Sequence, residues 1–412
     1  MNGRQLDEFK RQVDICLVCA ACFAHGPVTP HNWTELPPPE WDAPNDRCPS
    51  YEYYGLRSHT GMGRQMLAAS VFREGYPVDQ DLIDVVSSCT NCGVCSEVCP
   101  MWRPLDAIAA LRQEFVQRGL QPRATQKLDA NVAECHNLFR GRTREPVLEA
   151  LPRRGADLYF AGCEAAFRQG ATGRATVEIL RAAGIEVAHM GGDEWCCGFV
   201  ADWGGNASLS EEVARHNVQA AVAAGTERLI TSCAECYAVW KTHYPSVVGE
   251  LPFEVVHVSE VLAGLLDEGA LSFDHEIART VTYHDPCFLG RHGGVYDEPR
   301  RVLAAIPGLK VREMRRYGRW SYCCGSGGKL TQLTYPDFAD ATGAARVHEA
   351  EAVAGAVVTA CPACVMQLRR TAKKQRSALE VFDLPLMVAE AMGIEVGSRI
   401  TPGEDSAGGS DE

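Results

Sequence analysis

The sequence contains no long apolar run. No stretch approaches the roughly 18 to 20 apolar residues that a membrane-spanning helix needs. The first residues, Met1 to Lys10, also lack the apolar segment of a secretion signal. Positive charge is not in excess, because the formal net charge is −13, and this disfavours non-specific nucleic-acid binding. We therefore expect a cytoplasmic protein with no direct membrane span and no nucleic-acid partner.

Nucleotide-binding motifs are missing as well. No convincing G-x-G-x-x-G follows a predicted strand. The glycines of Gly325-x-Gly327-Gly328-Lys329 have neither the spacing nor the Ser/Thr of a P-loop. We therefore expect no flavin or nicotinamide in this chain, and such chemistry would belong to a partner.

Cysteine, by contrast, is abundant. The chain has 19 cysteines in 412 residues, and an odd number cannot all pair internally. Structural disulfides are disfavoured in a reducing compartment, so this content indicates metal binding or redox activity. Cys135 stands apart from every motif, and we expect a buried free thiol there.

The N-terminal cysteines have the spacing of a two-cluster ferredoxin. Three evenly spaced cysteines followed by Cys-Pro occur at Cys89, Cys92, Cys95 and Cys99. In two-cluster proteins the fourth cysteine of such a run binds the other cluster, so a partner motif is required. Two [4Fe–4S] clusters are predicted. One is held by Cys16, Cys19, Cys22 and Cys99, and the other by Cys48, Cys89, Cys92 and Cys95. A pair of zinc sites is the alternative.

The remaining ten cysteines follow one pattern that occurs twice: a single cysteine, then Cys-Cys-Gly, then C-x-x-C. The first set is Cys163, Cys196, Cys197, Cys233 and Cys236. The second set is Cys287, Cys323, Cys324, Cys361 and Cys364. Five thiolates exceed the four that hold an ordinary cubane cluster, and adjacent cysteines can bridge neighbouring irons. The pattern predicts two equivalent metal centres; zinc with a spare thiol and buried structural cysteines are the alternatives.

From about residue 156, strand-like runs alternate with helical stretches, and the order repeats with a period near 125 residues. This predicts parallel sheets with helices on both faces, including strands at 185–189 and 309–314. Four cysteines directly follow predicted strands and should meet at the carboxyl edges of the sheets. The expected fold class is mixed α+β and α/β. The expected parts are a helical two-cluster ferredoxin-like domain (1–120), a linker helix region (121–155), duplicated α/β domains (156–272 and 273–395) and a disordered acidic tail (396–412).

On these motifs the chain resembles the cysteine-rich (CCG-domain) superfamily, with the layout of heterodisulfide reductase D subunits. The resemblance spans about residues 10 to 395. Similar layouts occur in iron–sulfur subunits of anaerobic glycerol-3-phosphate dehydrogenase, glycolate oxidase and the benzoyl-CoA reductase complex. The resemblance to this family implies that each set holds a noncubane [4Fe–4S] cluster. It also implies that the ten cysteines of the two sets are catalytic and that a disulfide is split between the two sets. Both sets are complete here, which favours disulfide chemistry.

His284, which precedes Asp285, Pro286 and Cys287, resembles the family's approach to the second set. A histidine with a near-neutral pKa could deliver protons to product thiolates as a catalytic residue, and a ring hydrogen-bonded to backbone is the alternative. Arg291, His292 and Lys329 could attract an anionic substrate, although for each of them solvated surface is the simpler expectation.

Three functions fit these features. The first is an enzyme subunit that passes electrons from two [4Fe–4S] clusters to the noncubane sites and reduces a small-molecule disulfide, with flavin- or iron–sulfur-containing partner subunits. The second is a non-catalytic carrier that links a flavoprotein dehydrogenase to a quinone or ferredoxin system. The third is the iron–sulfur subunit of a glycerol-3-phosphate or 2-hydroxyacid dehydrogenase.

Overall fold

The computed structural model describes residues 48–99, 103–140 and 142–397. Cys16, Cys19 and Cys22, the proline-rich segment before Cys48 and most of the predicted acidic tail lie outside the described residues. In the described part of the chain, no helix combines the length and apolar character that crossing a bilayer requires.

Residues 48–99 and 103–120, the N-terminal module, are helical. Thr60 and Asp79 accept hydrogen bonds from the Gly63 and Leu82 amides at 3.0 and 2.9 Å, and so cap two of its helices. One helix begins at Pro104 and ends at Gln117, before Gly119 in the left-handed region. The helices are α2 (Pro49–Tyr54), η4 (Arg57–His59), α3 (Gly61–Glu74), α4 (Gln80–Ser87), α5 (Val94–Val98) and α6 (Pro104–Gln117).

Residues 156–272, the first half, surround a parallel sheet in the order β1-β2-β3. Its strands are β1 (Asp157–Phe160), β2 (Arg228–Thr231) and β3 (Glu254–His257). The helices before and around this sheet are α7 (Arg123–Cys135), α8 (Pro146–Glu149), α9 (Gly162–Phe167), α10 (Gly170–Ala182), η5 (Gly191–Asp193), α11 (Phe199–Gly204), α12 (Ala207–Ala223), α13 (Ala234–Ala238), η6 (Val239–His243), α14 (Tyr244–Val248) and α15 (Val258–Asp267).

Residues 273–395, the second half, contain a parallel sheet in the order β5-β4-β6-β7. Its strands are β4 (Thr280–His284), β5 (Lys310–Val311), β6 (Ala356–Thr359) and β7 (Glu380–Asp383). Its helices are α16 (Asp297–Ala305), η7 (Gly318–Trp320), α17 (Leu330–Thr334), α18 (Pro336–Glu351), α19 (Pro362–Gln375) and α20 (Leu384–Ala391).

Two predicted strands are much shorter than expected. The segment 185–189 forms only one parallel bridge, between Leu158 and Ala188, and the segment 309–314 forms only β5. Both lie at a sheet edge, where one side of the backbone has no neighbouring strand and pairing can end early. With this bridge counted beside β1, the two sheets have the same parallel order.

The two halves pack on each other symmetrically. Helix α10 of the first half contacts α20 of the second, and α15 contacts α16, so equivalent helices exchange places across the interface. One buried apolar core extends through both sheets and includes Leu128 and Val132 of α7, in the expected linker region. Ile394 and Val396 also pack against it, so ordered packing continues to the start of the expected tail. The halves thus share one core.

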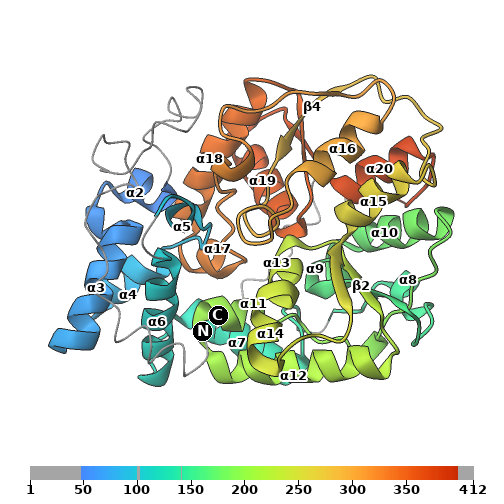
Figure 1. Cartoon of the computed structure of the whole chain (residues 1–412). Coiled ribbons are helices and arrows are strands. Elements are labelled where there is room, and N and C mark those ends of the chain that lie inside the picture. Colours follow the sequence, from blue (N-terminus) through green and yellow to red (C-terminus); the bar gives the residue numbers. More distant parts are fainter. Residues whose placement is uncertain (1–47, 100–102, 141, 398–412) are drawn as a thin grey trace.

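The N-terminal module lies beside the second half. Figure 1 shows its helices α2 to α6 at one side of the molecule, next to α17 and α18. Partly buried hydroxyls bridge this interface: Tyr335 donates to Asp84 and Tyr322 donates to Glu52, both at 2.7 Å. These contacts fix where the ferredoxin-type loop meets the α/β body.

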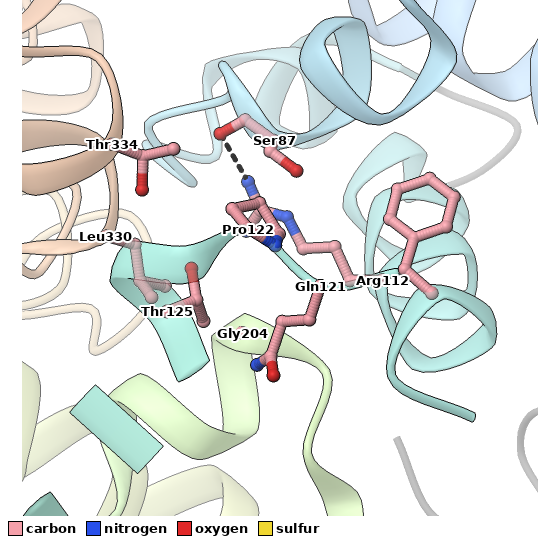
Figure 2. Close-up of a pocket in the computed structure, with 9 residues that line it drawn as sticks. Ser87, Arg112, Gln121, Pro122, Thr125, Gly204, Leu330 and Thr334 are labelled. Carbon is pink, nitrogen blue, oxygen red and sulfur yellow. Dashed lines mark hydrogen bonds between the residues drawn. The ribbon is translucent and has the colours of Figure 1, made fainter. Parts of the chain in front are cut away.

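Arg112 on α6 ties the module to the first half. It is buried and lines a small cavity between α4, α6, α11 and α17 (Figure 2). Its guanidinium donates to Asn91 Oδ1 and the Trp203 carbonyl, both at 2.8 Å. It also donates to the carbonyls of Val86, Ser87 and Cys89 at 3.2, 3.2 and 3.0 Å. One side chain therefore satisfies five acceptors from two parts of the chain.

We predict that Arg112→Met lowers the free energy of unfolding by about 2 to 4 kcal/mol, because buried carbonyls lose their donor. Arg118→Met is the matched control: it directly follows the same helix, is largely exposed and pairs with Glu114, so a loss below about 0.5 kcal/mol is expected. Anaerobic chemical denaturation followed by circular dichroism measures both. Equal losses in the two variants would contradict the role assigned to Arg112.

Candidate metal centres

The ten repeated cysteines form one continuous series. Thiol hydrogen bonds join each to the next, in the order Cys163, Cys196, Cys197, Cys236, Cys233, Cys361, Cys364, Cys324, Cys323 and Cys287. Counted inward from the two ends of the series, both sets pass through equivalent positions in the same order. They meet in the middle, at the first cysteine of each C-x-x-C. The contact between Cys233 and Cys361 is therefore the centre of the series.

Strand ends and sharp turns bring these cysteines together. Cys233 and Cys361 lie just beyond the carboxyl ends of β2 and β6, next to the edge at which parallel sheets bind ligands. Gly198 and Gly325 follow the adjacent cysteine pairs with φ of +77° and +95°. Both positions require the left-handed backbone that glycine adopts easily. A Cβ on Gly162 would lie 2.7 Å from Cys236 Sγ, so glycine also gives this sulfur room.

The buried thiols cannot all be ionised without added positive charge. Hydrogen bonds from Cys236 and Cys361 lower the pKa of Cys233 to about 6. The same bond to Cys233 raises the pKa of Cys361 to about 12. Like charges this close disfavour a second ionisation. Metal cations would supply the missing charge and allow several thiolates at once.

The donor chemistry of both sets fits iron and sulfide. Every cysteine in the described ranges is free of disulfide bonds. Within the two sets every side chain except that of Cys287 is buried, and the donors are sulfur. Such soft, crowded thiols suit iron–sulfur clusters or zinc rather than hard cations. The predicted ligands of the two sets are thus brought together.

Of the ferredoxin-type cysteines, Cys48, Cys89, Cys92 and Cys95, which are assigned to one cluster, also lie close together. The nearby Cys89 and Cys92 help to raise the pKa of Cys48, after the larger effect of burial. Cys48 therefore lies beside the loop that carries the other three predicted ligands of its cluster. Cys95 packs against Gly61 at the start of α3. Arg64, fully buried, donates to the Val85 carbonyl at 2.8 Å and also bonds the His59 carbonyl. Cys99 is partly exposed, and its expected co-ligands lie outside the described residues.

The ferredoxin-type loop touches one end of the cysteine series. Cys92 and Cys323 belong to the same small buried cluster, against which Cys287 and Trp320 pack. A side-chain hydrogen bond from Thr90 reaches Cys323. The end of the series formed by the second set is therefore the end nearest to the N-terminal module.

Arg291 and His292 hold this contact. Arg291 Nε donates to the Cys92 carbonyl at 2.6 Å, and His292 Nε2 donates to the Asn91 carbonyl at 2.9 Å. Burial lowers the pKa of Arg291, but the nearby Cys92, Cys287 and Cys323 raise it by more. The expectation that these two residues are solvated surface is therefore wrong, because both bind the loop across the interface.

Comparison with known proteins identifies a known domain over each cysteine-rich region. A model of the cysteine-rich CCG domain matches residues 158–241 and 281–369, and a 4Fe-4S dicluster domain matches residues 11–102. The D subunit of the dihydromethanophenazine:CoB–CoM heterodisulfide reductase of Methanosarcina barkeri is 34% identical over 398 residues, covering 93% of this chain and 95% of that protein. Its Methanosarcina acetivorans counterpart is 32% identical with the same coverage. The chain belongs to the family of heterodisulfide reductase D subunits.

This membership makes the chain an iron–sulfur oxidoreductase of the electron-transfer type, which confirms the iron–sulfur redox function predicted from the sequence. The same matches support the presence of iron–sulfur clusters in general. An EtfAB:quinone oxidoreductase of Syntrophomonas wolfei is 32% identical over 79% of this chain and 50% of its own length. A solved Helicobacter pylori protein described as hypothetical, 11% identical, has a TM-score of 0.53 over 81% of this chain and 68% of that protein, which indicates a shared fold.

His284 is buried at the end of β4, and a side chain rather than the backbone holds it. Its Nδ1 accepts a hydrogen bond from Arg346 Nε at 2.9 Å. Burial, together with Arg346 and Arg291, lowers the pKa of His284 well below its ordinary value. The near-neutral pKa expected from the sequence is therefore not found. A ring nitrogen of His284 and the Sγ atoms of Cys324 and Cys364 lie within 4.8 Å of one another.

A buried ion pair joins the halves near the cysteine series. Lys329, expected at the surface, is about 5% exposed and pairs with Glu164, the residue after Cys163. Its Nζ also lies 3.5 Å from Met366 Sδ, two residues after Cys364. Glu235 lies inside the first C-x-x-C, where burial raises its pKa well above the ordinary value. Sequence reasoning gave Glu164 and Glu235 no role; their positions beside predicted ligand cysteines were the available signal.

We predict that Lys329→Met lowers the free energy of unfolding by about 3 to 5 kcal/mol, because it leaves the Glu164 carboxylate buried and unpaired. Adding Glu164→Gln should recover most of this loss, since the uncompensated charge is then gone. Anaerobic denaturation of the single and double variants measures the coupling. A double variant as unstable as Lys329→Met alone would contradict a buried charge pair.

Proposed function

We propose that this chain accepts electrons at its N-terminal module and passes them to the two five-cysteine sets, where a disulfide is reduced to two thiols. The observation that carries the proposal is the contact of Cys92 with Cys323, at one end of the continuous cysteine series. The D-subunit relatives are named as heterodisulfide reductases, which supports a small-molecule disulfide as the substrate class.

Four [4Fe–4S] clusters are proposed. The two cubane clusters are held by Cys16, Cys19, Cys22 and Cys99, and by Cys48, Cys89, Cys92 and Cys95. The two noncubane clusters are held by the first set and the second set. Crowding, burial and the absence of disulfides among the described cysteines support these assignments. When bound, the clusters supply one-electron chemistry and iron that can accept sulfur.

The reaction needs two electrons and two protons for each disulfide. The S–S bond breaks, and each sulfur becomes a thiol. The electrons come from a redox partner, because this chain has no recognisable flavin or nicotinamide motif of its own. The chain's own part is to hold ten thiols in a dry, continuous series and to fix the ferredoxin-type loop against its end with Arg291 and His292.

A flavin- or iron–sulfur-containing subunit is the proposed electron donor. The relatives' names mark them as one subunit of a larger reductase, which supports a complex of this kind. We also propose the domain division at 1–120, 156–272 and 273–395. The two matching sheet orders and the positions of the domain-model matches support it.

We predict that the anaerobically reconstituted chain binds about sixteen irons and reduces a disulfide with a reduced viologen as donor. Cys196→Ser and Cys323→Ser should each lower turnover at least tenfold while the ferredoxin-type signals remain in the electron paramagnetic resonance spectrum. Removing one predicted ligand from either set should be enough to lower turnover, because the proposed reaction uses both sets.

Cys135→Ser is the control, since this cysteine belongs to neither set. It is a free thiol as expected, but it is partly exposed rather than buried, because it lies at the end of α7. Turnover of this variant should match that of the parent chain. Rapid cluster reduction with no turnover of a panel of disulfides, including mixed disulfides of anionic thiols, would instead favour a pure electron carrier. Zinc in place of iron at the two sets would remove the proposal.

A further inference from the structure

The tautomer of His284 is set by its neighbour. Arg346 is fully buried and is held in place by Glu349 Oε2 and the Arg316 carbonyl, both at 2.7 Å. Its Nε–H can only donate, and it points at His284 Nδ1 at 2.9 Å. Nδ1 must therefore present its lone pair. In the neutral ring, which burial beside a guanidinium favours, the proton is on Nε2.

His284 Nε2 has no hydrogen-bond partner among the described residues, although the side chain is only 1% exposed. An orphaned buried N–H is costly, so a partner at this position is expected. The sulfur atoms of Cys324 and Cys364 are the neighbouring acceptors, within 4.8 Å of a ring nitrogen. Because Nδ1 is engaged by Arg346, the group that the ring can offer to a nearby sulfur is the Nε2 N–H and not a metal-binding nitrogen.

We propose that His284 donates its Nε2–H to a sulfur of the cluster held by the second set and makes that cluster easier to reduce than the cluster of the first set. This rests on the proposed function. Added electrons increase the negative charge on the sulfurs, so a fixed N–H stabilises the reduced state more than the oxidised state.

The first set has no histidine at the equivalent position. Phe160 precedes Cys163 by three residues, as His284 precedes Cys287, and its buried ring packs on Trp240 at a centroid distance of 5.3 Å. The cationic Arg291 adds to the difference, because it lies near Cys287 and Cys323. The set that touches the ferredoxin-type loop is thus also the set with the stronger stabilisation of added electrons, which makes it the first acceptor.

Replacing His284 by the residue of the first half tests this. In the anaerobically reconstituted full chain, His284→Phe should lower the midpoint potential of the second-set signal and leave the first-set and ferredoxin-type signals unmoved. Redox titrations followed by electron paramagnetic resonance measure these potentials, and Cys196→Ser and Cys323→Ser assign the signals to their sets. His284→Gln keeps an N–H donor and should recover part of the shift.

His257→Gln is the matched control. His257 is also buried, and its Nδ1 accepts from the Ser259 amide at 3.2 Å, but it is not grouped with the cysteine sulfurs. It should leave both potentials unchanged. A second-set potential that stays constant in both His284 variants would overturn the inference, and so would ligand-sized coupling to ¹⁵N-labelled histidine. Iron missing from the second set of the parent chain would overturn the proposed function as well.

Discussion

The structure depends on packing ten thiols into one buried series across two halves of the chain. Burial and mutual repulsion prevent these sulfurs from ionising together, so the arrangement is stable as a metal site and costly without one. The architecture follows from that constraint. Parallel sheets bring strand ends to one edge, glycines with positive φ let the backbone turn tightly after each Cys-Cys pair, and a shared core presses the two edges against each other.

The two ends of the cysteine series have different surroundings, although the two sets are arranged symmetrically about its centre. One end contacts the loop of Cys92, which Arg291 and His292 bind, and His284 lies beside Cys324 and Cys364 of the same set. The other end, at Cys163, is next to Glu164, which pairs with Lys329 from the opposite half. A duplicated scaffold therefore gives unequal environments, because the ferredoxin-type loop of the N-terminal module packs on the second set. This inequality suits the proposed function, in which electrons enter at the second set and are used between the two sets.

Much of the site was predictable from cysteine spacing. Spacing alone indicated which sulfurs belong together, and the strand–helix alternation indicated that four of them follow strand ends, because periodicity is a local property of the sequence. The strands at the sheet edges were predicted too long. Whether a strand has a neighbour on both sides is decided by the tertiary structure and not by the local sequence. Lys329, Arg291 and His292 were expected at the surface for a similar reason: their burial comes from partners 165 to 201 positions away in the chain.

The sequence by itself determined the two five-cysteine sets, the duplication and the iron–sulfur character of this protein, because these reside in residue types at fixed local spacings. Only the tertiary structure decided that the two sets touch at Cys233 and Cys361, that the ferredoxin-type loop meets the second set, and that Arg346 fixes the ring of His284. Those three facts join residues far apart along the chain. They depend on how helices and sheets pack, and no local pattern records that.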